Sequence, residues 1–282
     1  MVGHVIPPER VHIVQYQKFI YYNIMGLDLT GNKLYSTSIG PKGEIVKQIS
    51  TDGLILHLDA SNKNSYVGSG ATWTDLSGNG NHGTLYNSPT FSSSDGSGSL
   101  NFNGSNQYAQ ANINSTLLDG DPNFTIEFFV KRTATLVGTT GAYWGLGQGG
   151  TQGLAVQGWT PTDNRIHMDL WDSSRVDSQQ DYPLNTYVHV VWSKIGTGIS
   201  PSTVSCYVNG VLASSISGRG QTSGPNYPTS TAGNGISIGR IAGNYNGYYG
   251  ACKMGLFRVY TRGLSAGEVL QNYNAQKARF GL

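Results

Sequence analysis

Apolar and polar side chains alternate with a two-residue period along many short stretches of this chain, which is typical of β-strands. Four apolar side chains of the stretch 124–132 fall on one strand face: Phe124, Ile126, Phe128 and Val130. A strand with one apolar face packs that face into a core, so we expect these side chains to be buried. In the stretch 187–194 we expect the same of Trp192, and we also place Trp144 in the core.

The strand pattern recurs from Thr51 onward, and no helix-period segment interrupts it before the C-terminal region. The predicted strands span residues 54–59, 99–104, 107–112, 124–132, 142–147, 153–158, 165–171, 187–194, 203–208, 211–217, 236–241 and 250–261. The dipeptide Asn209-Gly210 lies between two apolar runs and predicts a two-residue hairpin turn. Many short strands joined by tight turns predict an all-β fold of two antiparallel sheets packed face to face.

One helix is expected, close to the C-terminus. Ser265 with Glu268 three residues later forms a capping-box pattern, and Leu264 and Val269 are spaced for a hydrophobic staple across the helix start. Three apolar side chains of this helix should pack on the sandwich: Val269, Leu270 and Tyr273.

Residues 1–50 differ from the rest of the chain. The segment Val11–Tyr22 is β-prone with apolar side chains on both faces of one strand, which requires partners on both sides. Four of these side chains are candidate contacts of an assembly arm: Ile13, Phe19, Ile20 and Tyr22. A second strand pair, Leu34–Ile39 and Glu44–Ile49, is joined by a Gly-Pro-Lys-Gly turn. The extension either packs on the sandwich or docks the subunit into a larger assembly.

The segment Trp73–Leu85 is a structured loop between strand-like stretches. It holds three glycines that permit positive φ, and four short polar side chains that can form Asx and Ser turns. These four side chains are Asp75, Ser77, Asn79 and Asn81.

At this loop a family resemblance becomes visible. The motifs WTDLSGNGNHGTL, SLNFNGSNQYA, FTIEFFVKR, CYVNG and GLFRVYTRGLSAGEVLQNYN resemble the concanavalin A-like or laminin-G-like jelly roll over residues 51–282. The segments GLILHLDASNKNSYVGSG and YNAQKARFGL are most similar to versions in structural proteins of tailed bacteriophages. The resemblance implies a lectin-type sandwich, spanning 51–282, on a virion surface.

The amino-acid composition narrows the range of possible binding partners. Only 12% of residues are charged and the net charge is +2, so the chain lacks the excess of positive charge that would indicate a nucleic-acid partner.

The N-terminal sequence lacks the pattern of a signal peptide, and no run of about 18 apolar residues occurs, so we expect synthesis in the host cytoplasm and no membrane insertion. Without a secretion signal, Cys206 and Cys252 are expected to be free, packed thiols.

Hydrolytic chemistry finds little support in the sequence. Glycosidases need two carboxylates flanking the scissile bond, and Glu127 has no second acid two or four residues further along its strand. Glu268 is assigned to the helix cap. Neither cysteine has an activating sequence context, and no metal-binding His or Cys pair occurs. We therefore expect a protein without enzymatic activity.

Calcium is the one cofactor considered. Asp75, Ser77 and Asn79 followed by Gly80 repeat the first half of a calcium-binding loop, but Tyr86 occupies the position where a bidentate Glu is needed. The expectation is a hydrogen-bonded loop without an essential cofactor. The residues that would hold calcium, if it were bound, are Asp59, Asp75, Asn79 and Asn81.

Aromatic side chains in turn-rich sequence are candidates for stacking on sugar rings. The candidate glycan contacts are Trp159, Asn244, Tyr245, Asn246, Tyr248 and Tyr249. Tyrosine-rich loops also line subunit interfaces, so both roles stay open.

Together with the resemblance, these patterns predict a virion protein that decorates the capsid or forms a tail fibre and attaches to host surface polysaccharide. Residues 1–50 would contact other virion proteins, and we expect a homo-oligomer, a trimer by analogy with phage fibres. A soluble carbohydrate-binding module is the alternative, and a glycoside hydrolase a more remote one.

Overall fold

The computed structural model describes residues 12–16, 19–27, 34–39, 45–46, 48–113, 123–134, 141–146, 156–160, 165–170, 174–196, 203–217, 235–241 and 248–282. The chain divides into two compact units, Met1–Ile49 and Ser50–Leu282. Among the helices of these described residues, none combines the length and the apolarity that a bilayer span requires.

The N-terminal unit is a four-stranded antiparallel meander, β1 (His12–Tyr16), β2 (Phe19–Leu27), β3 (Leu34–Ile39) and β4 (Ile45–Val46). The prediction of one strand over residues 11–22 is wrong, because the chain reverses between Tyr16 and Phe19. The register places Ile13 opposite Tyr22, Gln15 opposite Ile20 and Tyr16 opposite Phe19. The predicted arm positions therefore belong to two paired strands, whose side chains lie outside the described part of the structure.

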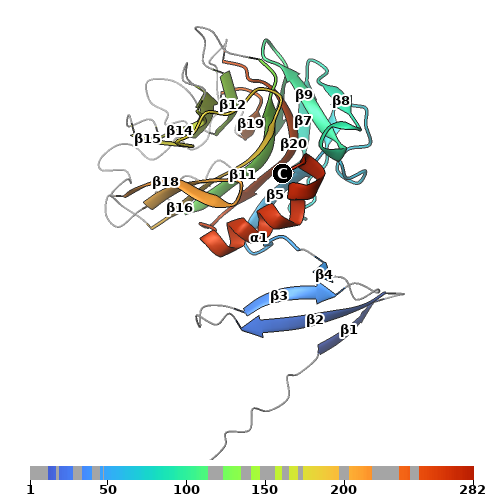
Figure 1. Cartoon of the computed structure of the whole chain (residues 1–282). Coiled ribbons are helices and arrows are strands. Elements are labelled where there is room, and N and C mark those ends of the chain that lie inside the picture. Colours follow the sequence, from blue (N-terminus) through green and yellow to red (C-terminus); the bar gives the residue numbers. More distant parts are fainter. Residues whose placement is uncertain are drawn as a thin grey trace, which may run out of the picture. The chain divides into compact units, whose positions relative to one another are not determined.

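The second unit is a sandwich of two antiparallel sheets (Figure 1). The first, here called the front sheet, has the order β15 (Ser174–Asp177), β14 (His167–Leu170), β13 (Val156–Thr160), β12 (Gly141–Leu146), β19 (Ile236–Ile238), β10 (Tyr108–Ala111), β7 (Gly83–Tyr86) and β6 (Thr72–Trp73). The predicted all-β jelly-roll class is confirmed.

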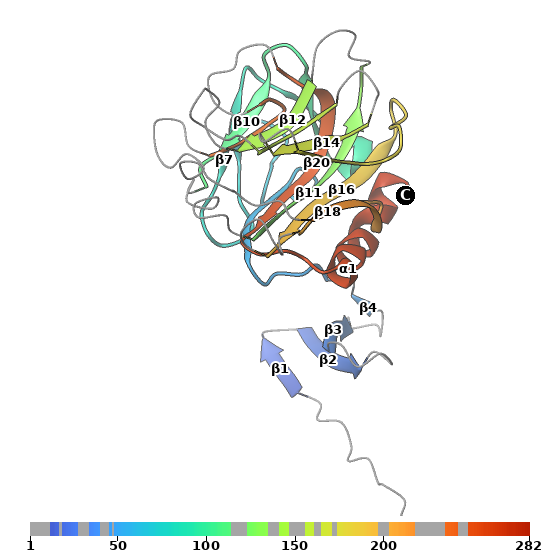
Figure 2. The same ribbon diagram turned by 90° about the vertical axis from the view of Figure 1, so that its left-hand side faces the viewer.

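The second sheet, here called the back sheet, has the order β18 (Val211–Ser217), β17 (Thr203–Val208), β16 (Tyr187–Ile195), β11 (Phe124–Arg132), β20 (Ala251–Tyr260), β9 (Ser99–Asn103) and β8 (Thr90–Ser92). The strand β5 (Leu54–Asp59) also pairs with β20: residues 251–254 of β20 face β9, and residues 256–260 face β5. Figure 2 shows the long strands β20, β11 and β16 running side by side.

The main core fills the space between the sheets, where the inward faces of both interdigitate. Trp144 of the front sheet lies against Trp192 of the back sheet with ring centroids 5.8 Å apart, and Trp192 in turn contacts Phe128 at 5.6 Å. Both tryptophans and Phe128 have no exposed area. The predicted core face of β11 is therefore confirmed.

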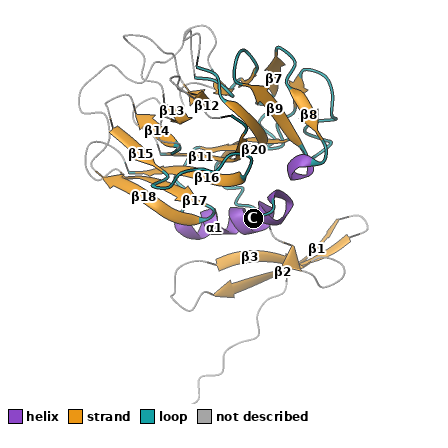
Figure 3. Ribbon diagram, turned by 45° about the horizontal axis from the view of Figure 1, so that its top comes forward, coloured by secondary structure: helices purple, strands orange, loops and turns teal. Residues whose placement is uncertain are grey.

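The back sheet is buried on its other face too. The helix α1 (Ala266–Gln276) and the 3₁₀ helices η1 (Asp95–Ser97) and η3 (Lys277–Phe280) complete the unit, and Figures 1 and 3 show α1 on the side of the back sheet away from β12 and β14. Val269 of α1 packs with Val191 and Tyr260, while Phe280 of η3 stacks on Phe129 at 4.3 Å. Strand β11 therefore has buried side chains on both faces.

The C-terminal helix begins as the sequence predicts. Ser265 and Glu268 form both hydrogen bonds of the capping box, and Leu264 and Val269 share a buried cluster. One part of the helix prediction is wrong: Leu270 is 45% exposed, because it lies on the solvent side of α1 next to the β17–β18 hairpin.

Two further sequence predictions are confirmed. Asn209 and Gly210 form the two-residue turn between β17 and β18 with positive φ at both positions, which matches the twist of the flanking strands. Cys206 and Cys252 are free and buried, and burial raises the pKa of each thiol well above its usual value.

Candidate functional site

A cross-strand pair of tyrosines stands on the front sheet. Tyr86 of β7 and Tyr108 of β10 occupy directly opposite positions in the ladder. Their rings are stacked, with centroids 4.6 Å apart and planes only 9° from parallel. Tyr86 is 40% exposed to solvent. The neighbouring positions Leu85 and Ala109 point into the core, so the strand alternation turns the two tyrosines outward.

Arg240, which follows β19 by two residues and forms an isolated β-bridge with Tyr249, extends this stack. Its guanidinium carbon lies 3.7 Å from the centroid of the Tyr108 ring. One of its terminal nitrogens, Nη2, donates to Gln110 Oε1 at 3.3 Å, and Ser237 Oγ donates to the same oxygen at 3.0 Å. Stacking and this hydrogen bond fix the plane of the guanidinium group.

A returning segment holds the predicted residues Tyr248 and Tyr249, of which Tyr249 lies beside the stack. It pairs with the chain after β19 through hydrogen bonds from Ile241 N to Tyr248 O at 3.1 Å and from Gly250 N to Gly239 O at 2.9 Å. The Tyr249 ring lies 6.3 Å from that of Tyr108, and Tyr248 is 38% exposed.

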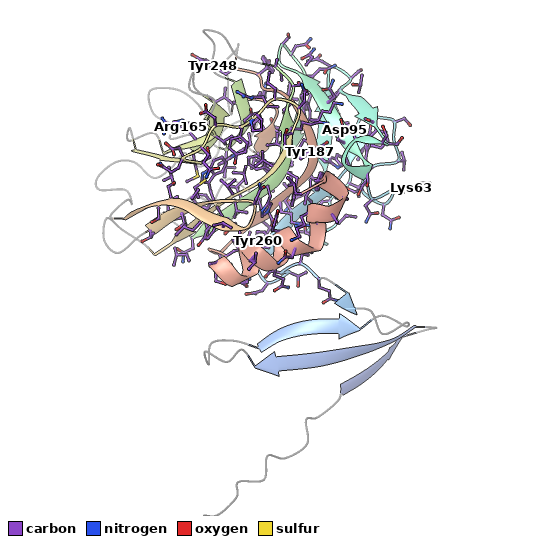
Figure 4. The ribbon with its side chains drawn as sticks, in the orientation of Figure 1. Lys63, Asp95, Arg165, Tyr187, Tyr248 and Tyr260 are labelled. Atoms are coloured by element: carbon purple, nitrogen blue, oxygen red, sulfur yellow. The ribbon has the colours of Figure 1, made fainter. Side chains whose placement is uncertain are left out.

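We call this group the tyrosine–arginine surface; its members are Tyr86, Tyr108, Gln110, Arg240 and Tyr249. In Figure 4, Tyr248 lies on the far side of the sandwich from Tyr260, which is beneath α1. Stacked aromatic faces beside a fixed guanidinium can hold a ring that is apolar on one face and polar at its edge.

The other predicted glycan residues are not brought to this surface by the described structure. Trp159 lies on β13, opposite Ala142 and His167. Its side chain lies outside the described part, as do residues Asn244, Tyr245 and Asn246. Sequence reasoning missed Tyr86 and Tyr108. The signal was present in the segment Tyr108–Ala111, where large polar side chains alternate with alanines that face the core.

The candidate calcium residues are engaged in protein hydrogen bonds. The Asp75 carboxylate accepts from the backbone nitrogens of His57 at 2.8 Å, Ser77 at 2.9 Å and Asn81 at 3.0 Å. The side-chain amide of Asn81 donates to Ile55 O at 2.7 Å, and that of Asn79 to Leu54 O at 3.1 Å. The loop thus covers the edge of β5 that β20 does not pair with, and Asp75 organises it.

Asp59 belongs to a different set of contacts. Its carboxylate is bound by Arg279 Nη1 at 2.9 and 3.0 Å and accepts from Ser61 N at 2.9 Å. Burial acts to raise the pKa of Asp59, but Arg279 and Ser61 outweigh it and lower the pKa below its usual value. In the described part of the chain, no three His, Cys, Asp or Glu side chains gather to hold a metal ion.

Glu127 is the centre of a buried polar network between the back sheet and α1. Its Oε1 lies 3.0 Å from His189 Nε2 and 3.2 Å from Arg258 Nη1, and its Oε2 accepts from Asn272 Nδ2 at 2.8 Å and from the Tyr260 hydroxyl at 3.2 Å. All five side chains have no exposed area. Burial acts to raise the Glu127 pKa, but Arg258 and His189 outweigh it and lower the pKa to about 2.

The same network affects His57, which lies opposite Arg258 in the β5–β20 ladder. Burial and the neighbouring Arg258 guanidinium lower the pKa of His57 to about 3. The imidazole is therefore neutral at physiological pH. Water and ligands cannot reach this network. Its role is therefore structural: it holds α1 on the back sheet.

Comparison with known proteins agrees with this fold. The profile described as "Concanavalin A-like lectin/glucanases superfamily" matches residues 102–270, more than half of the chain. The chain therefore belongs to the concanavalin A-like lectin/glucanase superfamily. No curated protein sequence matches it.

Solved structures with the same fold include the binding domain of Paraclostridial Mosquitocidal Protein 1, with a TM-score of 0.57 and 16% identity over 80% of this chain and 52% of that one. The receptor binding domain of botulinum neurotoxin C/D mosaic serotype has a TM-score of 0.58 and 16% identity over the same shares. Trypanosoma rangeli sialidase in complex with sialic acid has a TM-score of 0.60 and 15% identity over 96% of this chain and 45% of that one. The chain spans about half the length of these proteins, and the likeness concerns the fold alone.

Proposed function

We propose that this protein is a non-enzymatic display protein, whose lectin-like sandwich binds surface polysaccharide while its N-terminal unit attaches it to a larger assembly. The observation that carries this proposal is the exposed stack of Tyr86 and Tyr108 with Arg240 on the front sheet. Aromatic faces flanked by fixed polar groups are the usual means by which proteins hold sugar rings. The lectin-like fold supports the same function.

The assembly that we propose is a bacteriophage virion, as capsid decoration or tail fibre. The support is the resemblance of the segments at 53–70 and 273–282 to virion structural proteins. The meander of the N-terminal unit offers edge strands β1 and β4, and an edge strand can pair with a neighbouring chain. Paired in this way, the subunits would form a homo-oligomer, for which we propose a trimer.

The non-enzymatic part of the proposal rests on the carboxylates. Most glycosidases need two carboxyl groups within reach of one substrate. Glu127 is fully buried in its network, and Glu268 is held by Arg262 at 2.6 Å and by the helix cap. Glu127 cannot meet a polysaccharide without unfolding of the C-terminal helix, and the carboxylate of Glu268 is already engaged by these partners.

Binding of the full-length protein to a panel of bacterial surface polysaccharides tests the proposal, with release of reducing ends measured in parallel. We expect binding without reducing-end release. The Tyr86→Ala variant should bind about 5- to 10-fold more weakly, because one exposed stacking face is lost.

Leu212→Ala is the matched control, since Leu212 is 52% exposed on β18 of the other sheet, and it should bind like the unaltered protein. Reducing-end release that is abolished by heating the protein would refute the non-enzymatic assignment. Equal binding by Tyr86→Ala and the unaltered chain would refute the role of the tyrosine–arginine surface.

A further inference from the structure

Arg240 differs in its partner from the ion-paired guanidinium groups of the sandwich. Arg258 pairs with Glu127, Arg262 with Glu268 and Arg279 with Asp59. Within the described part of the chain, Arg240 is bonded instead to Gln110, a neutral amide, and is stacked on Tyr108. Its positive charge is therefore not compensated by a neighbouring described carboxylate.

The sequence around this site is free of acidic residues over a long distance. The six consecutive strands of the front sheet from β13 to β6 contain no Asp or Glu. In the chain itself no acidic residue occurs between Asp181 and Glu268. The same interval contains these basic residues: Lys194, Arg219, Arg240, Lys253, Arg258 and Arg262. An anion approaching the tyrosine–arginine surface therefore meets no charge of its own sign on these six strands.

The geometry suits one kind of anion. Arg240 and Tyr86 both stack on the Tyr108 ring and form one row with it. The plane of the guanidinium group is therefore fixed before any ligand binds. Only one of its terminal nitrogens donates to Gln110. A planar guanidinium with unused N–H groups pairs with a carboxylate through two parallel hydrogen bonds. The exposed Tyr86 ring lies next in the row, where a sugar ring can stack.

We propose that the ligand of the tyrosine–arginine surface is a saccharide that carries a carboxylate, and that Arg240 binds this carboxylate while Tyr86 stacks on a sugar ring. This proposal rests on the proposed function and names its substrate class. Hexuronic acids and nine-carbon sialic-type acids share this chemistry, and the experiment distinguishes these two sources.

The test measures binding of the full-length protein by isothermal titration calorimetry. The four probes are oligogalacturonate, the same oligomer with its carboxyls methyl-esterified, oligosialic acid and neutral oligogalactan. We expect at least one acidic oligomer to bind about tenfold or more tightly than the neutral probes, since one charge-assisted hydrogen-bond pair is lost without the carboxylate. Comparison of the acid with its methyl ester shows whether the charge or the sugar ring is recognised. Comparison of oligogalacturonate with oligosialic acid distinguishes hexuronic from sialic-type acids.

The Arg240→Gln variant should lose this preference, so that it binds the acidic oligomer no more tightly than the methyl ester. Arg240→Lys should keep part of the preference for the acidic oligomer, because lysine keeps the charge but lacks the planar guanidinium group. Lys63→Gln is the control for the loss of one exposed charge elsewhere on the sandwich and should behave like the unaltered protein. Should Arg240→Gln fail to fold, the comparison of acid and ester on the unaltered chain decides.

The outcomes separate the two proposals. If acid and methyl ester bind equally, the carboxylate inference is overturned and the polysaccharide-binding function stands. If the acid preference persists in Arg240→Gln, the assignment of Arg240 is wrong. If neither the acidic nor the neutral probes bind, and no polysaccharide of the wider panel binds either, the proposed function fails together with this inference.

Discussion

At the scale of single residues, Phe128 shows how much stability one side chain of the inter-sheet core contributes. It is completely buried and contacts Trp192 and Phe257, with ring centroids 5.6 and 5.7 Å away. We expect Phe128→Ala to lower the free energy of unfolding by about 3–5 kcal/mol, because transfer energy is lost and a cavity remains. Urea denaturation measures this difference.

Val211→Ala is the control for this experiment. Val211 is 67% exposed, so its truncation should change the free energy of unfolding by no more than about 0.5 kcal/mol. A loss below about 1 kcal/mol for Phe128→Ala would show that this face of β11 does not form the core.

His57 makes the free energy of unfolding of the sandwich depend on pH in a range where a carboxylate alone would not. Its pKa is about 3 in the folded protein and about 6.5 in an unfolded chain, so the unfolded state binds the extra proton between these values. The stability that neutral His57 contributes is fully present above pH 6.5 and is lost as the pH falls toward 3. In this window the free energy of unfolding should fall by up to about 1.4 kcal/mol per pH unit.

Urea unfolding at pH 7.5, 6.0 and 5.0 measures that slope. Glu127 contributes at lower pH only, because its pKa is about 2 in the fold and about 4.5 otherwise. The variant His57→Gln should therefore have a shallower slope between pH 6.5 and 5 than the unaltered protein. Identical slopes for His57→Gln and the unaltered protein would contradict the prediction.

At the scale of structural elements, the loop after β6 is expected to depend on hydrogen bonds and not on a cation. Asp75→Asn removes the charge and one acceptor from a carboxylate that serves three backbone N–H groups. We expect it to lower the free energy of unfolding by about 1–3 kcal/mol, since buried donors lose their partner. Thermal melting with and without a calcium chelator should give one and the same transition for the unaltered protein.

Asn79→Ala provides the comparison, because the exposed Asn79 amide donates one hydrogen bond to the β5 edge and its loss should cost less than about 1 kcal/mol. A melting temperature that falls with chelator and recovers with calcium would mean that Asp75 is a metal ligand.

The long strands of the sandwich could be predicted from the sequence, and so could the short strands β10, β14 and β19, whereas other short strands could not. The stretch 124–132 alternates clearly and was located at both ends, as was the hairpin at Asn209. Strands β6, β7, β8 and β15 have only two to four residues each, rich in Gly, Ser and Thr. Their pairing is fixed by distant strands and not by their own pattern, so local alternation carries little information about them.

The second buried face of β11 was also beyond sequence reasoning. Glu127 is polar and alternates with core residues, which favours a solvent-facing position. In the structure the position is covered by α1, whose Asn272 donates to it. The tyrosine–arginine surface was predicted in part, because Tyr249 stands in turn-rich sequence, while Tyr86 and Arg240 join it only through pairing across strands.

At the scale of the whole molecule, the N-terminal unit is the part that we expect to join the protein to its assembly. A shortened chain that begins at Gln48 keeps the contacts of Ser50, whose backbone nitrogen donates to Asn272 Oδ1 at 2.8 Å. This chain should fold and be monomeric but fail to join virions, because the edge strands β1 and β4 are gone. Co-sedimentation with particles and analytical ultracentrifugation measure the two properties.

The matched control keeps the full length and replaces Gln15 by Pro, which removes one backbone donor of β1 and should weaken assembly only in part. Assembly of the shortened chain at the level of the intact protein would show that residues 1–47 are not the attachment.

The pairing of β5 with β20 also governs how this protein is made. Asp59 stands opposite Leu256 and Leu58 opposite Phe257, so the first strand of the sandwich finds its neighbour only after the strands between β5 and β20 have been synthesised. At roughly 5–20 residues per second, β20 follows β5 out of the ribosome by ~10 s or more. During that time the apolar face of β5 has no permanent partner. The sandwich should therefore close only after β20 has emerged, and chains that end before β20 should aggregate and not accumulate as partly folded domains.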